Sequence, residues 1–100
     1  MRISYAGDHV LTGDEAALLM LEFAGELGKR GSTETVQLNI VQPSGESGIA
    51  RFLIGPASQI IISSHFTAIA DPDNSDAMSF MQSRMGQMSV YGDREAGDDS

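Results

Sequence analysis

The chain has 100 residues and a mass of 10.6 kDa, which suits one domain built around one hydrophobic core. Fourteen acidic residues oppose six basic ones, so the formal net charge is −8, and there is no cysteine. This composition excludes a disulfide scaffold, a thiolate metal site and a cysteine nucleophile. It also argues against nucleic acid as a partner, because no cluster of Lys or Arg is present to neutralise phosphates.

Short extended segments are predicted before the first helix. Residues 2–6 alternate polar and apolar side chains, with Ile3 and Tyr5 on one face, which is typical of a strand. Residues 7–8 signal a turn, and residues 9–11 either return as a second short strand or lead into the helix. The segment lacks the basic, apolar and small-residue order of a signal peptide, so we expect a cytoplasmic protein.

A long helix is predicted over 13–30. Thr12 and Glu15 have the spacing of a capping box, in which the threonine hydroxyl accepts a hydrogen bond from the Glu15 amide. Basic residues at 29–30 suit the C-terminal end, and Gly31 stands where a left-handed residue closes a helix. Apolar and small residues cover roughly 260° of the circumference, against the stripe of about 100° that a surface helix needs. The helix is therefore expected to need cover on two sides.

Three strand patterns follow. Residues 34–41 alternate, residues 43–48 are rich in turn formers, and residues 49–54 return as a second alternating strand. No glycine or proline interrupts residues 59–70, whose alternation predicts either one long strand or a strand with an extended tail. Residues 52–70 carry no formal charge, but their polar and helix-breaking residues and their period near two argue against a membrane span.

The acidic segment 71–76 breaks the last strand and caps a second helix, predicted over 76–88 with Asn74 or Ser75 as its N-cap. Residues 89–100 are acidic and almost without apolar side chains, so we expect a disordered tail there.

The fold expected from these elements is an α+β domain spanning residues 1–88. A mixed or antiparallel sheet of about four strands packs on one long helix, in the order β-α-β-β-β-α, and a short second helix follows near the C-terminus.

Methionines recur along the second predicted helix at spacings of three, four and three, which places them on one stripe. Methionine is flexible and polarizable, and it recurs both in cores and on adaptable binding surfaces. The pattern leaves open whether the stripe is internal core or an interface. Its members are Met78, Met81, Met85 and Met88.

Two motifs that suggest ligands fail on spacing. Residues 25–33 evoke a phosphate-binding loop, but too few residues separate the glycines and a helix ends there instead of beginning. The acidic residues 71–76 lack the glycine and the distal glutamate of a calcium loop, and helix capping accounts for them. We therefore expect no metal and no cofactor.

Histidine chemistry is the remaining catalytic possibility. His9 and His65 are the only imidazoles, and adjacent strand residues such as those at 63–65 point to opposite faces, so they do not form a Ser–His pair. No catalytic residue is therefore assigned, although enzymatic activity stays open. The alternative to an interaction protein is a ligand-binding protein or minor enzyme with its pocket at a subunit seam. Its candidate polar residues are Tyr5, Asp8, His9 and His65.

The apolar residues exceed what these elements are expected to cover. If one sheet face packs on the long helix, the opposite face still carries Ile49, Leu53 and Ile61. A second copy of the chain is the simplest cover for that face or for the methionine stripe. We therefore expect a homodimeric protein-interaction module that contacts itself and, in a wider role, another protein.

Overall fold

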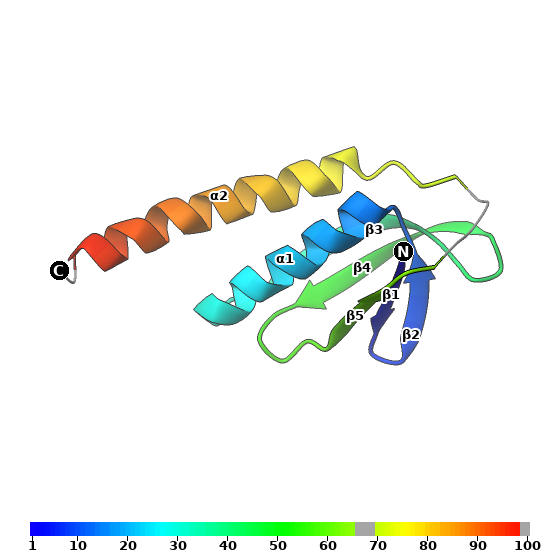
Figure 1. Cartoon of the computed structure of the whole chain (residues 1–100), viewed down its shortest axis with the longest axis horizontal. Coiled ribbons are helices and arrows are strands. Elements are labelled where there is room, and N and C mark those ends of the chain that lie inside the picture. Colours follow the sequence, from blue (N-terminus) through cyan, green and yellow to red (C-terminus); the bar gives the residue numbers. More distant parts are fainter. Residues whose placement is uncertain (66–69, 99–100) are drawn as a thin grey trace.

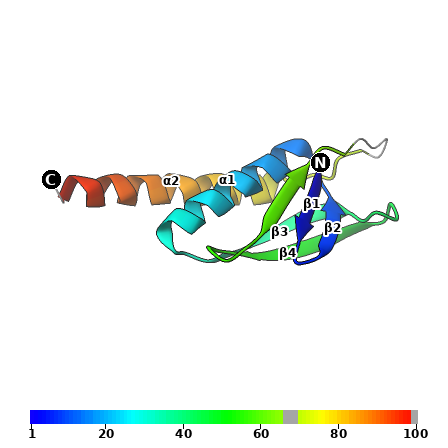
Figure 2. The same ribbon diagram turned by 60° about the horizontal axis from the view of Figure 1, so that its bottom comes forward.

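The structure, a computed structural model, describes residues 1–65 and 70–98, with side chains as far as Met88. Five antiparallel strands form one sheet in the spatial order β4-β3-β2-β1-β5, and both helices lie on one side of it (Figures 1 and 2). The elements are β1 (Arg2–Tyr5), β2 (Asp8–Leu11), α1 (Asp14–Arg30), β3 (Glu34–Val41), β4 (Ser47–Ile54), β5 (Ile60–Ser63) and α2 (Ser75–Asp98).

The predicted α+β class is confirmed, but the sheet has five strands where about four were expected. The added strand is β2, which forms a hairpin with β1 through a turn that contains Gly7 at φ 88°. Of the two alternatives for residues 59–70, one long strand is wrong, because β5 covers only Ile60–Ser63. All of β5 pairs with the equally short β1, so its ladder ends where its partner ends. Residues 66–69 of that prediction lie outside the described residues.

The ends of α1 agree only in part with the sequence. Gly31 closes the helix at φ 66°, as predicted, and its amide donates to the carbonyl of Gly28. The predicted capping box is wrong, because the N-cap is Gly13 and no side chain caps the helix. The Thr12 hydroxyl instead donates to the Asn39 carbonyl oxygen at 3.0 Å. A partner distant in sequence has replaced the local one.

The core lies between the inner face of the sheet and the two helices. The buried face of α1 supplies Phe23 and Met20, and the ring of Phe23 meets Phe80 of α2 in an edge-to-face contact. Leu18 and Leu21 of α1 remain exposed, so the helix is covered over less of its circumference than its composition suggested. The largest fully buried side chains are Phe23, Ile3, Met20, Leu27, Leu38, Ile54, Met81 and Val36.

The sheet is strongly joined within its hairpins and weakly joined between them. Strands β3 and β4 pair along their whole lengths, whereas β2 meets β3 only at Leu11 and Val41. Beyond that pair, α2 runs beside β3, with Asn74 bonded to Asn39 and Arg84 paired with Glu34. The ten residue steps from Asn74 to Arg84 span about 15 Å of helix, and the five from Glu34 to Asn39 span about 17 Å of strand. Because these lengths are similar, α2 stays beside β3 between the two contacts.

The second helix is longer than predicted. It runs from Ser75 to Asp98, where the sequence pattern predicted a helix over 76–88 followed by a tail, and it projects past the end of α1 (Figure 1). No proline follows Pro72 to stop the helix, and residues such as Arg94 and Glu95 favour helical backbone.

Candidate functional site

The four residues predicted to form a ligand site do not converge. Tyr5 faces the core side of the sheet, where its ring meets Phe52 edge to face. His9 pairs with Ser4 on the opposite face, and its Nδ1 lies 3.4 Å from the serine hydroxyl. Asp8 and His65 are exposed. The set therefore divides between two faces of the sheet.

The two histidines are also separated along the sheet. Ser4 pairs with His9 on one side and with Ile61 on the other, so those three residues lie at one level of the sheet. His65 follows Ile61 four residues later and lies beyond the end of β5, outside the strand pairing that positions His9. This arrangement does not hold two imidazoles on one substrate, and it does not favour catalysis by them.

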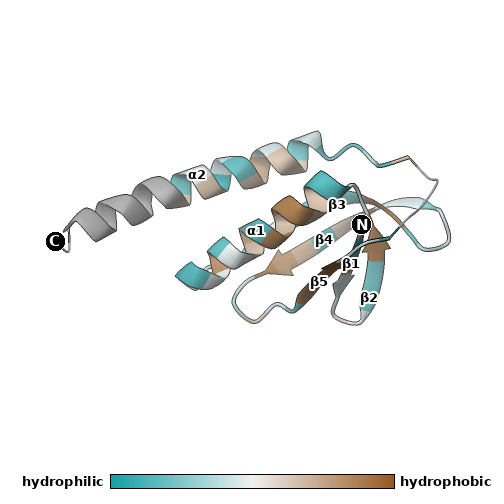
Figure 3. Ribbon diagram, in the orientation of Figure 1, coloured by the Kyte–Doolittle hydropathy of each residue, from teal (hydrophilic) through white to brown (hydrophobic). Residues whose placement is uncertain are grey.

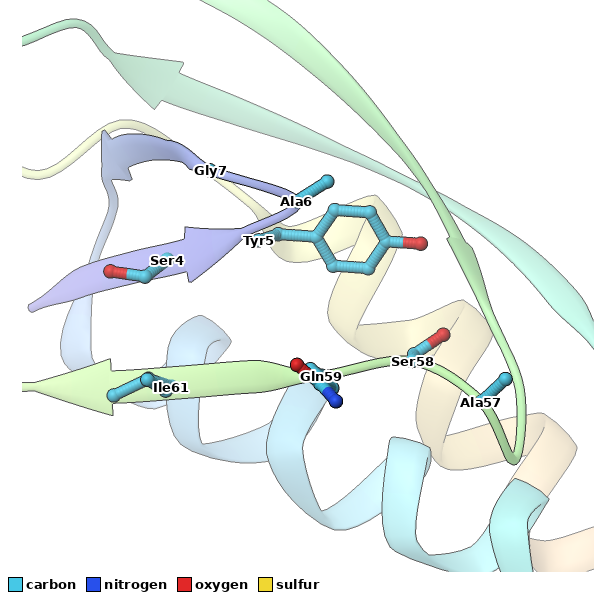
Figure 4. Close-up of a pocket in the computed structure, with 8 residues that line it drawn as sticks. All are labelled: Ser4, Tyr5, Ala6, Gly7, Ala57, Ser58, Gln59 and Ile61. Carbon is cyan, nitrogen blue, oxygen red and sulfur yellow. The ribbon is translucent and has the colours of Figure 1, made fainter.

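A hollow lies between the β1–β2 turn and the β4–β5 turn (Figure 4). Its volume is about 470 Å³, and no charged side chain lines it. The hydroxyl of Tyr5 donates to the Leu53 carbonyl oxygen, as does that of Ser58 at 3.3 Å, so both groups are already occupied. Sequence reasoning missed the contribution of the β4–β5 turn, because only the fold brings the turn to Tyr5. The lining consists of Ser4, Tyr5, Ala6, Gly7, Ala57, Ser58, Gln59 and Ile61.

A second hollow, of about 420 Å³, lies where both helices begin and is bordered by acidic side chains. The hydroxyl and then the amide of Ser75 bind the carboxylate of Asp73 and hold its pKa below the ordinary value of 3.8. Among the side chains that the structure describes, in residues 1–65 and 70–88, no group of His, Asp or Glu is arranged to hold a metal ion. Asp73 therefore serves the start of α2.

The methionine stripe faces into the protomer. Met81 is 0% exposed and belongs to the core, while Met85 and Met88 are half-buried and pack against it. Met78 is half-buried beside the N-terminus of α1, where it borders the acidic hollow. Of the two alternatives that the sequence left open for the stripe, Met81 takes the internal one, as part of this chain's own core. Nothing in the sequence distinguishes a stripe that covers this chain's own core from one that covers a partner.

The other predicted surface residues are exposed. Ile49 and Leu53 of β4 are 58% and 60% exposed, and Ile61 of β5 is 64% exposed. The pairing registers place all three on the sheet face away from the helices, which we call the outer face. Figure 3 shows the apolar colour of both strands. Large apolar side chains exposed on one face are typical of an interaction surface.

No strand position on the outer face is acidic, although the chain has a net charge of −8. Acidic side chains border the face beside β3, where Asp73 and Asp76 line a hollow with Gln37 and Asn39, and not at β4. Its charged members are Arg2 and Arg51, and the remaining positions are apolar or neutral polar. By register the face consists of Arg2, Ser4, His9, Leu11, Thr35, Gln37, Asn39, Val41, Ser47, Ile49, Arg51, Leu53, Ile61 and Ser63. Among the side chains that the structure describes, the acidic ones occur instead on the helices, in the segments that connect the elements, and at two strand positions of the inner face. Those two are Asp8, opposite Tyr5, and Glu34, which pairs with Arg84.

No protein-family model, curated protein or solved structure matches the chain. Within the described part of the chain, neither helix is both long and apolar enough to cross a membrane. Functional inference therefore rests on the geometry and charge of the surfaces above.

Proposed function

We propose that this protein is a homo-oligomeric interaction module, in which two copies meet through the β4 side of the sheet, where Ile49 and Leu53 are exposed. The observation that carries the proposal is the coincidence of these exposed apolar side chains with outer-face positions of β4 that carry no carboxylate. Two molecules of net charge −8 repel one another, and they approach with least repulsion through a surface free of acidic groups. Burial of the apolar side chains then favours association.

The alternative of a ligand-binding protein or minor enzyme has less support. Its candidate residues lie on opposite faces of the sheet, and the hydroxyl of Tyr5 is engaged by the Leu53 carbonyl oxygen. The hollow beside Tyr5 has no charged side chain to act as acid or base.

Light scattering after size exclusion tests the proposal at micromolar concentration. We expect a mass about twice 10.6 kDa. Replacing Ile49 by Lys should weaken association about tenfold or more, because it adds a charge to a contact surface. Leu18→Lys is the matched control, since Leu18 is 49% exposed on α1, away from the sheet's outer face. A wild-type mass of 10.6 kDa at every concentration would overturn the proposal.

A further inference from the structure

We propose that the two copies join by pairing the free edges of their β4 strands, so that the two sheets become one. This inference rests on the proposed self-association and specifies how it occurs. Strand β4 is the last strand of the sheet on its side, and it is long and carries exposed apolar residues. An edge of this kind is a template for a further strand.

The direction of the backbone groups on β4 follows from Asn39. The amide of Asn39 donates to the side-chain oxygen of Asn74 at 2.7 Å, and its carbonyl oxygen accepts from the Asn74 side-chain nitrogen at 3.0 Å. Both groups of Asn39 therefore point away from β4. Because residues directly opposite in an antiparallel pair share this orientation, Ile49, the partner of Asn39, points its own amide and carbonyl to the free edge.

The same orientation recurs two and four residues further along β4, at Arg51 and Leu53. The Leu53 carbonyl oxygen agrees with this, since it accepts hydrogen bonds from Tyr5 and from Ser58. Within the described residues, the edge is thus occupied at Leu53, while Ile49 and Arg51 turn their amides and carbonyls outward with no strand beside them.

A two-fold axis between two β4 strands can pair the backbone groups of Ile49 in one copy with those of Arg51 in the other. If Ala50 lies on the axis, Ile49 stands opposite the second copy's Arg51 and makes a reciprocal pair of backbone hydrogen bonds with it. The alternative that places Arg51 opposite itself brings like charges together and is disfavoured. Ala50 opposite Ala50 is a closely spaced pair, and its small side chains allow that approach. Edge pairing also leaves Ile61 outside the contact.

Cross-linking tests this register directly, because the chain has no cysteine. In Ala50→Cys, mild oxidation should give a disulfide-linked dimer, since closely spaced antiparallel pairs meet the distance that a disulfide requires. Ser83→Cys, exposed on α2, is the matched control and should stay monomeric on a denaturing gel.

A backbone variant supplies an independent test. Arg51→Pro removes an outward amide, a position where an edge strand tolerates proline, and should raise the dimer dissociation constant about tenfold or more. Arg51→Gln keeps the amide and should change the constant less than about threefold. Circular dichroism checks that each variant is folded. Hydrogen exchange of wild-type protein gives a readout without mutation: the amides of Ile49 and Arg51 should gain protection as concentration rises.

The outcomes separate this inference from the proposed function. Suppose that Ile61→Lys dissociates the dimer, that Arg51→Pro leaves it intact and that Ala50→Cys forms no cross-link. This combination would overturn edge pairing in favour of packing between outer faces. Self-association would then survive. A monomeric wild-type protein would overturn both. Cross-linking of the Ala50→Cys variant together with dissociation by Arg51→Pro supports edge pairing.

Discussion

The two long sides of the β3–β4 hairpin differ in what covers their backbone groups. On the β3 side, Asn74 binds the backbone of Asn39 and Arg84 pairs with Glu34, so α2 closes the edge that β2 leaves after a single pair. On the β4 side, the only described closure is at the Leu53 carbonyl oxygen. β3 is an interior strand that β2 and α2 cover together, whereas β4 is the last strand of the sheet on its side and has no strand beyond it among the described residues.

The closed edge depends on a side chain that imitates a strand. The amide group of Asn74 offers a donor and an acceptor in the places where a neighbouring strand would supply an N–H and a C=O. Asn74 is 6% exposed, and its nitrogen also donates to the Thr12 hydroxyl at 2.8 Å. The carbonyl of Asn74 accepts the amide of Met78, which ties this bond to the first turn of α2.

Asn74→Ala should therefore break the closed edge, with the largest effect expected. It leaves the Asn39 amide without its partner and removes one of the two hydrogen bonds made by the Asn39 carbonyl and by the Thr12 hydroxyl, which still bind each other. We expect a loss of about 2–3 kcal/mol in the free energy of unfolding. For a domain of this size the loss corresponds to a fall in melting temperature of roughly 10–20 °C. Thermal or urea denaturation followed by circular dichroism measures both.

Asn39→Ala is the control within the same network. It removes only the exposed bond from the Asn39 side chain to the Asp73 carbonyl and keeps the backbone bonds to Asn74. We expect a loss of about 0.5 kcal/mol or less. Equal losses in the two variants would show that the buried amide is not what closes the edge.

Tyr5→Phe should remove one of the two hydrogen bonds at the Leu53 carbonyl oxygen and leave the bond from Ser58, with a smaller effect. The variant keeps the edge-to-face contact with Phe52 and removes the hydrogen bond to the Leu53 carbonyl oxygen. The expected cost is about 1 kcal/mol, measured by chemical denaturation. Tyr5→Leu, which also loses the aromatic contact, should cost more. Absence of any change in Tyr5→Phe would show that the Leu53 carbonyl is equally well bound to water.

The smallest effect concerns pH at the start of α2. Hydrogen bonds from Ser75 lower the pKa of Asp73 in the folded protein from 3.8, so the folded state binds fewer protons at this site than the unfolded state. Its contribution to stability is complete above pH 3.8 and is lost as the pH falls through the lowered pKa. Nuclear magnetic resonance titration of the Asp73 carboxyl should show the shift, and Ser75→Ala should return the pKa toward 3.8. An unchanged pKa in that variant would contradict the assigned cause.

Local periodicity predicted much of this fold. The alternation in 34–41 correctly placed Val36 and Leu38 inward, and Gly31 correctly marked the end of α1. These predictions succeeded because hydrophobic period and backbone preference act between near neighbours in sequence.

Predictions that depended on distant partners failed or stayed open. Thr12 was assigned to a local capping box, but its hydroxyl binds Asn39 and Asn74. Tyr5 was placed with His9 in a candidate ligand site, but it binds Leu53 of β4, a strand that does not neighbour β1 in the sheet order. Polar side chains have several partners of similar energy, and the fold selects among them.

The amino-acid sequence by itself determined which residues are apolar, which face of each strand carries them, and that the acidic residues avoid the positions of Ile49, Arg51 and Leu53. Only the tertiary structure decided that Met81 is core and that one edge of the β3–β4 hairpin is closed while the other remains available to a strand. Periodicity sets the direction of a side chain, whereas burial and backbone pairing depend on which elements the folded chain brings together.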